Sequence, residues 1–407
     1  MVGMDNRSGD KFDFVIIGSG IIGISIGIGL LESSPHRTVL IQEKEMAPAS
    51  HASGRNSGVL HAGFYYTPDS LKARFCRLGN AEISRLCQEN DIPILRTGKV
   101  VVTQSNLEDR TLQTLFSRGI KNGVDVELLD SKLLSRFEPL ANTNQFFLWS
   151  PTTSIADVTA VNRTLLSKFL KLGGKIRFGA PVQLQVNGGE ITSLTGPQAK
   201  FYINAAGAGS IKIAHSIGAA KEYSLLPFLG LYYINRKLQQ NPTKLVYPVP
   251  HPTNAFLGIH TTKTLDGYTK IGPTAIPVLG IEQYDAKSLS HATEIGQVLK
   301  SLGSMVGRNL FKTVSLLTKE SRNYSKNIVL SKASALVPSL TSTKGWEKHP
   351  SGIRAQLVHM TSGELEQDFV VRYHNNSIHI LNAVSPGWTS ALPFGRWIAL
   401  KVQEALG

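Results

Sequence analysis

The segment from Asp13 to Glu45 constrains the fold more than any other part of this 407-residue chain. It begins with a short apolar run, "DFVIIG", and continues through the glycine-rich "GSGIIG" into "ISIGIGLLESS", whose composition is typical of a buried helix. A second apolar run, "TVLIQEKE", then ends in acidic residues. This order predicts a strand, a helix and a second strand of a βαβ unit, and therefore a parallel sheet at the start of the chain.

Three glycines in this segment have the spacing of a dinucleotide-binding turn. Gly18, Gly20 and Gly23 form a G-x-G-x-x-G motif at the strand-to-helix junction. The first glycine allows a tight turn, the second lets backbone approach a pyrophosphate, and the third lets helix and strand pack closely. Glu43 lies twenty residues after Gly23, where a carboxylate can accept hydrogen bonds from a ribose. The alternative is a glycine-rich helix packed for steric reasons alone.

The residues after Glu43 favour FAD over NAD. An NAD-binding domain would continue as alternating strands and helices, whereas here the second strand leads into "SGRNSGVLHAGFYY", Ser53 to Tyr66. A later "INAAGAG" supplies a second glycine turn after another predicted strand. An extended flavin dinucleotide needs contacts beyond the first βαβ unit, and these two stretches can provide them.

Charge restricts the partners of the chain. There are 43 Lys and Arg against 29 Asp and Glu, a net charge of +14, which suits acidic substrates or an anionic surface. The basic residues are dispersed and form no nucleic-acid-binding signature, so we expect no nucleic-acid partner.

The cysteines and the apolar runs indicate a cytoplasmic protein. The two cysteines, Cys76 and Cys87, lie in one predicted helix, and no Cys or His pair has metal-ligand spacing, so we expect neither a disulfide nor a metal site. The longest apolar run, 14–31, is interrupted by five glycines, which favours a buried strand, turn and helix over a membrane span. The polar residues 1–13 predict no secretory leader.

The remaining segments predict an α/β fold, α+β overall, with interleaved domains. Helices are expected at 68–90, 107–123, 299–326 and 395–406, a strand at 98–104, a β-rich region at 225–280, and a hairpin at 367–384 whose turn is "HNN". No repeat or low-complexity linker separates these segments.

Motifs along nearly the whole chain resemble one family. "DFVIIGSGIIG", "SGRNSGVLHAGFYYTPDSLKARFC", "GKVVV", "VYPVPHP", "LGIHTTKTLDG", "GIRAQL" and "NAVSPGWTSALPFG" are similar to the L-2-hydroxyglutarate dehydrogenase/oxidase branch of the D-amino-acid-oxidase-like FAD oxidoreductases. The resemblance implies a Rossmann-like FAD-binding domain with an inserted, largely antiparallel β-sheet substrate domain. It places the FAD-binding domain at 1–85, 150–222 and 340–407, and the substrate-binding domain at 86–149 and 223–339.

The resemblance also implies a set of cofactor-binding residues. The three motif glycines would meet the pyrophosphate and Glu43 the ribose, Val182 the adenine, and Ala206 and Gly207 the backbone side of the cofactor. The opening stretch and the C-terminal turn would line the flavin. The full set is Gly18, Gly20, Gly23, Glu43, Lys44, Ser53, Arg55, Asn56, Ser57, Gly58, Val182, Ala206, Gly207, Gly387, Trp388, Thr389 and Ser390. Because Cys76 and Cys87 do not match the attachment position of covalent relatives, noncovalent FAD is expected.

The activity implied is oxidation of a small 2-hydroxy carboxylic acid, L-2-hydroxyglutarate first, to the 2-oxo acid. Arg354, in "GIR", would grip the substrate carboxylate, since a planar guanidinium binds a carboxylate bidentately. The alternative for Arg354 is a structural salt bridge to Glu364, Glu366 or Asp368. His61 and His260 are the candidate proton acceptors, and each has the alternative of a purely structural role.

One motif departs from the branch. A polar "F-R-G-E-Y-Y"-like stretch is expected, but the chain has Phe228-Leu229-Gly230-Leu231-Tyr232-Tyr233. If Leu229 and Leu231 replace residues that read the distal carboxylate, a less polar hydroxy acid is favoured. Two further functions therefore stay open: oxidation of an amine or amino acid by the same fold, and a flavin-bound scaffold without turnover.

The electron acceptor is expected to be oxygen or quinone. The segment 299–326 interleaves basic residues with apolar ones, which fits an amphipathic element on the inner face of a membrane. The alternative is an ordinary solvated face of the substrate domain.

Overall fold

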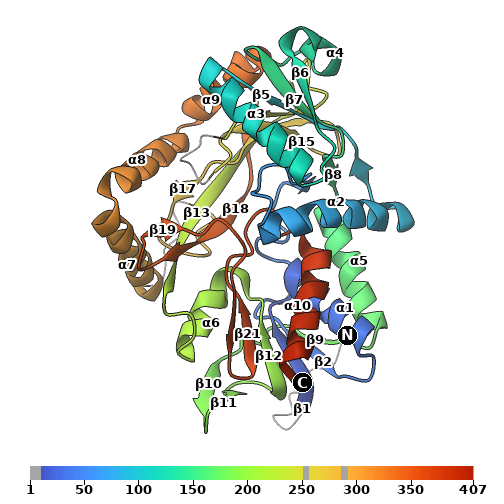
Figure 1. Ribbon diagram of the computed structural model, residues 1–407, viewed down its shortest axis with the longest axis vertical. Helices are drawn as coiled ribbons and strands as arrows, with labels where there is room; N and C mark the ends of the chain where they lie inside the picture. Colours follow the sequence, from blue (N-terminus) through green and yellow to red (C-terminus); the bar gives the residue numbers. More distant parts are fainter. Residues whose placement is uncertain (1–10, 251–255, 286–291, 407) are drawn as a thin grey trace.

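Two large sheets organise the protein, one at each end of the long axis (Figure 1). The computed structural model describes residues 11–250, 256–285 and 292–406. The smaller of the two sheets has six strands, in the order β20 (Val371–His374), β21 (Ser377–Ile380), β12 (Gln198–Asn204), β1 (Lys11–Ile17), β2 (Val39–Gln42) and β9 (Lys175–Arg177).

The predicted βαβ unit forms the centre of the six-stranded sheet. β1 pairs in parallel with β2 on one side and with β12 on the other, and β12 pairs in parallel with β21. Parallel strands end at the same edge of a sheet, so the turns at Gly18, Glu43 and Ala205 lie together. The prediction of a parallel sheet at the start of the chain is confirmed.

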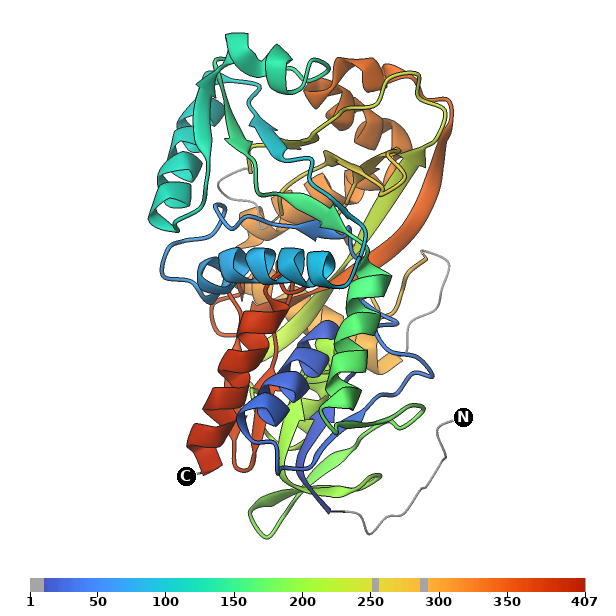
Figure 2. The same cartoon turned by 90° about the vertical axis from the view of Figure 1, so that its right-hand side faces the viewer.

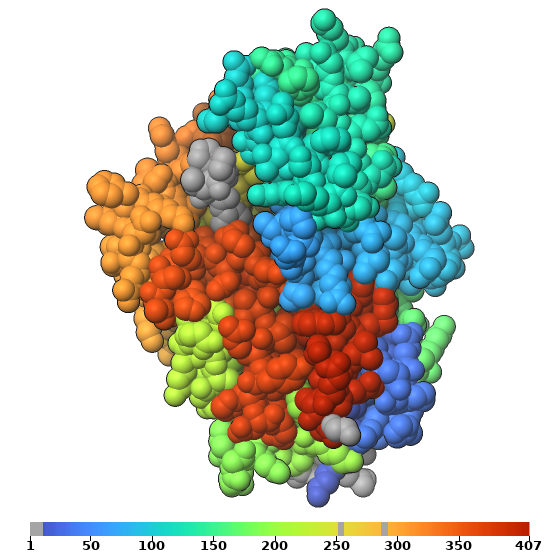
Figure 3. All heavy atoms as spheres, in the orientation of Figure 1, coloured from blue at the N-terminus to red at the C-terminus, as the bar shows by residue number. Residues whose placement is uncertain are grey.

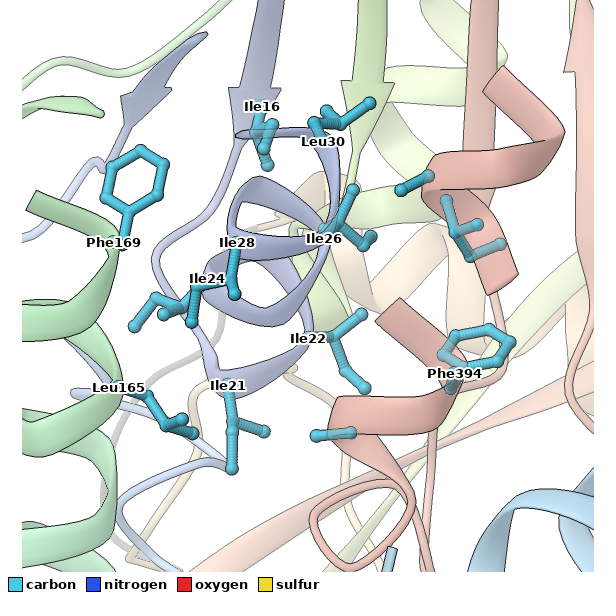
Figure 4. Packing of buried hydrophobic residues seen from close by; sticks show 14 of the residues in the cluster. Ile16, Ile21, Ile22, Ile24, Ile26, Ile28, Leu30, Leu165, Phe169 and Phe394 are labelled. Atoms are coloured by element: carbon cyan, nitrogen blue, oxygen red, sulfur yellow. The ribbon is translucent and has the colours of Figure 1, made fainter. Parts of the chain in front are cut away.

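Helix α1 (Ile21–Ser33) joins β1 to β2 and is apolar on every side. It is buried from Ile21 to Leu31, as expected for a helix with neighbours all round. Figure 2 shows α1 between α5 (Val158–Lys171) and α10 (Ala391–Leu406), with α2 (Leu71–Glu89) crossing their ends. Figure 4 shows its isoleucines between Phe169 of α5 and Phe394 of α10. Segments from both ends of the chain therefore share one core.

The larger sheet has ten strands and is largely antiparallel, as predicted. Its order is β19 (Glu364–Leu365), β18 (Trp346–His359), β13 (Tyr223–Asn235), β16 (Thr269–Gly272), β15 (His260–Lys263), β14 (Leu245–Pro248), β5 (Lys99–Val102), β7 (Phe146–Ser150) and β6 (Glu127–Asp130), with β17 (Ile276–Pro277) on β13. Only the β14–β5 pairing is parallel among the pairings described in this sheet. The long β13–β18 ribbon runs through the middle of the molecule (Figure 1).

Smaller elements surround these sheets. Two minor sheets consist of β3 (Val59–Leu60), β8 (Ser154–Ala156) and β4 (Ile94–Leu95), and of β10 (Leu184–Asn187) with β11 (Glu190–Ser193). The other α-helices are α3 (Asn106–Lys121), α4 (Leu134–Phe137), α6 (Ser210–Ser216), α7 (Ala292–Arg308), α8 (Leu310–Ser321) and α9 (Lys326–Leu336). Short 3₁₀ turns cover Ser131–Leu133, Gly207–Gly209, Arg322–Tyr324 and Pro338–Thr341.

We expect the α1–α10 contact to tolerate no side chain at Gly395. A Cβ atom there would lie 2.6 Å from the backbone carbon of Ser25, so Gly395→Val should lower the free energy of unfolding by about 1–3 kcal/mol. The matched control is Gly303→Ala on α7, where a Cβ meets nothing within 4 Å and helix propensity favours alanine. Thermal or urea denaturation measures both; equal stability of the two variants would contradict this account of the packing.

Candidate functional site

The glycine turn after β1 leaves no room for side chains. A Cβ on Gly23 would lie 2.1 Å from the carbonyl oxygen of Gly18, and one on Gly18 would lie 2.7 Å from that of Ala205. Gly18 also has φ of +104°, which favours glycine. The turn therefore brings α1, β1 and the end of β12 into direct backbone contact, and leaves the N-terminus of α1 facing the shared strand edge, where an anion is favoured.

Glu43 is fixed beside this turn. One of its carboxylate oxygens accepts hydrogen bonds from the Ser19 N–H at 2.8 Å and the Ser19 hydroxyl at 2.7 Å, and the other accepts from the Glu45 N–H at 2.9 Å. A carboxylate has about four lone-pair positions, so acceptor capacity remains for a ribose hydroxyl. Ser53, from the next stretch, accepts a 2.9 Å hydrogen bond from the Ile21 N–H at the start of α1.

Two further segments lie beside the glycine turn and the end of β2. The backbone N–H of Ala180 donates to the Glu43 carbonyl at 2.8 Å, which places the segment leading to Val182 next to the end of β2. Gly207 follows β12 with φ of +56°, and a Cβ there would meet no atom within 4 Å. Ala206 and Gly207 thus border open space next to the glycine turn.

The opening stretch and the C-terminal turn are joined through Thr389. Its hydroxyl accepts from the His61 N–H at 3.2 Å and donates to the Val59 carbonyl at 3.3 Å. Asn56 shapes the preceding loop by accepting from the Gly58 N–H at 2.9 Å. Among described residues, Trp388 Nε1 and Ser390 Oγ are buried without hydrogen-bond partners, as donors awaiting a ligand would be.

The side chains of three predicted cofactor-binding residues contact other protein groups or solvent. The Lys44 ammonium contacts the carboxylates of Glu282 and Glu45. Arg55 is exposed, and its guanidinium carbon lies 4.1 Å from the centre of the Tyr284 ring. The side chain of Ser57 contacts Tyr232 of β13, so this stretch also meets the larger sheet.

A half-exposed group beside Lys44 has the composition of a metal site. Ligand atoms of Glu45, His51 and Glu282 lie within 4.8 Å of one another. The Lys44 ammonium already pairs with both carboxylates, and His51 Nε2 lies 2.9 Å from Glu45.

His61 and His260 lie close together in the interior. Burial first, then the charges of Lys99 and His260, lowers the pKa of His61 to about 3. Burial likewise lowers the pKa of His260 to about 3. The Nδ1 atom of His260 lies 2.9 Å from the Gly258 carbonyl, which can only accept, so Nδ1 carries the proton and Nε2 is free to take one. Both rings are neutral at neutral pH.

Arg354 of β18 makes no ion pair with a carboxylate in the part of the chain that the structure describes. Its Nε donates to Gln356 Oε1 at 3.0 Å, and its guanidinium lies 4.9 Å from the Phe256 ring. Burial lowers its pKa to about 10. The alternative salt bridges are wrong: Glu364 pairs with Lys312, Asp368 accepts from backbone N–H groups, and no ion pair joins Glu366 to Arg354.

The two leucines of the departing motif face away from Arg354. Phe228 is paired with Arg354 across β13 and β18, and Leu229 with Ile353. Directly opposed residues share a face and successive residues alternate, so Leu229 points to the other side of the sheet. Leu229 and Leu231 there pack with Ile276, Val278 and Ile353. They therefore give no ground for excluding a polar substrate.

The sequence prediction missed three buried lysines and one tyrosine near these groups: Lys72, Lys99, Lys270 and Tyr247. A signal existed, because "GKVVV" places a lysine at the start of an otherwise apolar strand, which breaks the local pattern. Tyr247 stacks on His260 with ring centres 3.7 Å apart, so it belongs to the same interior group.

The comparisons with known proteins agree with this geometry. A family model described as FAD dependent oxidoreductase, DAO, matches residues 13–400. The chain belongs to this family. Among its relatives, the L-2-hydroxyglutarate dehydrogenase of Salmonella houtenae is 35% identical, over 96% of this chain and 93% of the relative. The enzyme of that name from Escherichia coli K12 is 34% identical, over 97% and 94%.

A solved structure shares the fold of this DAO-family chain. The L-alpha-glycerophosphate oxidase of Mycoplasma pneumoniae, with FAD bound, superposes with a TM-score of 0.74 at 22% identity, covering 97% of this chain and 95% of that one. The crowded glycine turn, the anchored Glu43 and the unpartnered donors of Trp388 and Ser390 fit FAD, the cofactor of the family.

We expect Glu43 to matter for holding FAD. Glu43→Ala would leave the N–H and hydroxyl of Ser19 without their acceptor and remove a ribose partner, so it should weaken FAD binding by about 1–3 kcal/mol. Glu45→Ala, two residues on and half-exposed, is the matched control. Titration of apoprotein with FAD measures the affinity; an equal loss in both variants would contradict the role of Glu43.

Proposed function

We propose that this protein is an FAD-dependent dehydrogenase that oxidises L-2-hydroxyglutarate to the 2-oxo acid. The observation that carries the proposal is Arg354, a half-buried cation with no carboxylate partner in the described chain, together with the two neutral histidines His61 and His260. The names of the similar full-length relatives support this substrate. The inward position of the arginine gives a carboxylate-bearing substrate a place to bind.

The chain's own residues account for orientation and proton transfer in this reaction. The Arg354 guanidinium would hold the substrate carboxylate bidentately. When bound, FAD supplies the acceptor for the α-hydrogen and its electron pair at flavin N5. His260 Nε2, unprotonated because Nδ1 faces the Gly258 carbonyl, would accept the hydroxyl proton as the C=O bond forms. His61, tied to Thr389 through its backbone, would line the flavin side.

We also propose the cofactor-binding set given above, and the domain division with it. The cofactor-binding domain would comprise 1–85, 150–222 and 340–407, and the substrate domain 86–149 and 223–339. β18 lies within the third cofactor segment and pairs with β13 of the substrate domain. This pairing would bring Arg354 from one domain to the substrate of the other.

Anaerobic bleaching of the bound flavin tests the substrate. L-2-hydroxyglutarate should bleach the holoenzyme, whereas bleaching by amino acids such as glycine alone would replace the proposal with amino-acid oxidation. Absence of bleaching by any small hydroxy or amino acid would indicate a scaffold without turnover.

In the same assay, Arg354→Met should lower kcat/KM about a hundredfold or more, mainly through KM, because the substrate carboxylate loses its paired cation. The matched control is Arg236→Met, since Arg236 is exposed and paired with Glu347. An unchanged KM in Arg354→Met would refute the carboxylate assignment.

We further propose that the surface of α7 and α8 contacts an anionic membrane. No helix among the described residues is long and apolar enough to cross a bilayer. The two helices form the left margin of the molecule in Figure 3. They expose apolar side chains, with Phe311 88% exposed and Leu299 57%, near basic residues such as Lys300. Binding there would bring the protein to membrane quinone, the electron acceptor that we propose, with oxygen as the alternative.

Phe311→Asp should weaken membrane binding about tenfold or more, since it replaces an apolar anchor with a negative charge. Co-sedimentation with phosphatidylglycerol-containing vesicles, compared with pure phosphatidylcholine, measures the binding. Leu107→Asp is the control, because Leu107 is 68% exposed on α3. Equal sedimentation of the parent with both vesicle types, or of both variants with the anionic ones, would refute this surface.

A further inference from the structure

Lys99 is a cation enclosed by aromatic rings. It begins β5 and is fully buried, and its Nζ has no hydrogen-bond partner among the described residues. The ring centres of Phe64, Tyr65 and Tyr247 lie 4.5, 4.6 and 4.8 Å from Nζ. Cation–π contacts of this kind contribute about 0.5–2 kcal/mol each, which does not replace a lost hydration shell.

Several buried polar atoms around Lys99 have no hydrogen-bond partner in the described chain. Besides Lys99 Nζ, the hydroxyls of Tyr65 and Tyr247 and the Nδ1 of His61 are buried without partners in the described chain. Burial raises the pKa of both tyrosines well above its usual value, so both hydroxyls keep their protons and can donate. Buried polar atoms are nearly always bonded in folded proteins, so four orphans in one neighbourhood fit a site that binds a polar ligand.

The buried side chains around this group favour an anionic ligand. Lys72, Lys99 and Lys270 are at most 5% exposed, and neither they nor Arg354 pair with a carboxylate in the described ranges. The buried acids are bonded elsewhere: Glu43 to Ser19, Asp109 to Thr103, Glu138 to Thr243 and Glu320 to Asn323. Burial lowers the pKa of Lys72 and Lys99 to about 7 and that of Lys270 to about 8, so an incoming anion would be bound by the protonated lysines and would favour their charged forms.

The Lys99 group adjoins the reacting centre. Lys99 is close enough to His61 and His260 for its charge to lower the pKa of each. Tyr66, next to Tyr65 in the chain, is within range of the charges of both Arg354 and Tyr247, which puts these groups in one neighbourhood. Lys99 and its neighbouring hydroxyls therefore form a second polar group of the protein in the same interior as Arg354.

We propose that Lys99, with the hydroxyls of Tyr65 and Tyr247, binds the second carboxylate of a dicarboxylic substrate. The proposal rests on the function proposed above for the identity of the substrate. Two carboxylate oxygens offer enough lone pairs to accept from the ammonium and both hydroxyls, which would satisfy three of the four orphans at once. Lys99 would then select diacids over monoacids of the same length.

Equilibrium binding separates this role from turnover. Glutarate and pentanoate have the same chain length and no hydroxyl to oxidise, so their dissociation constants are measured by perturbation of the flavin spectrum in the holoenzyme. The parent should bind glutarate more tightly. Lys99→Met should weaken glutarate binding about ten- to a hundredfold, the value of a charged hydrogen bond, and leave pentanoate binding within about twofold. Lys121→Met, on the exposed face of α3, should change neither constant.

Folding is checked by thermal denaturation. Removing an unpaired buried charge should leave the melting temperature of Lys99→Met unchanged or raise it. If Lys99→Met loses its flavin, Tyr247→Phe provides the test instead, because it removes only one hydroxyl. The proposal predicts that Tyr247→Phe weakens the binding of glutarate but not of pentanoate.

Two results would overturn the proposal: equal losses for glutarate and pentanoate, which indicate a structural or proton-transfer role, and no loss for either. A parent protein that binds glutarate through Lys99 but is not bleached by L-2-hydroxyglutarate would instead refute the proposed function and retain the diacid site.

Discussion

The backbone contact between Gly18 and Gly23 is the constraint on which the rest of the structure depends. Because neither residue has room for a Cβ, β1 can turn directly into α1 and the end of β12 can approach the same point. This contact fixes the N-terminus of α1 at the edge where Glu43 and Gly207 also arrive. Wider spacing there would separate the helix from its sheet and α10 from α1, and the cofactor edge would lose its geometry.

Most of the architecture could be predicted because its signals are local. The βαβ unit follows from apolar runs and glycines, and the "HNN" turn appears as the β20–β21 hairpin with Asn375 at φ of +48°. The predicted strand at 98–104 is β5, and the predicted basic helical segment became α7 and α8. The cofactor-binding residues that we propose come from the glycine motif, whose spacing is set by backbone geometry, and from the family resemblance.

The interior charges could not be predicted in the same way. Lys99, Lys72 and Lys270 are far apart in sequence, and only the folded sheet and α2 bring them into one interior. The two leucines of β13 illustrate a different difficulty. The sequence shows that Leu229 and Leu231 replace expected polar residues, but it does not show which face of the sheet they occupy. Side-chain direction in a strand depends on register, and a bulge between Gly230 and Tyr232 shifts that register.

The bond between Thr389 and the backbone at Val59 and His61 joins residues separated by about 330 positions. During synthesis, residues 53–61 emerge long before Thr389, β21 and α10. The glycine turn therefore lies far before the C-terminal turn with which the stretch from Ser53 would form the proposed flavin site. The ordering of residues 53–61 thus depends on a contact of high sequence separation, which makes it slow to form during folding.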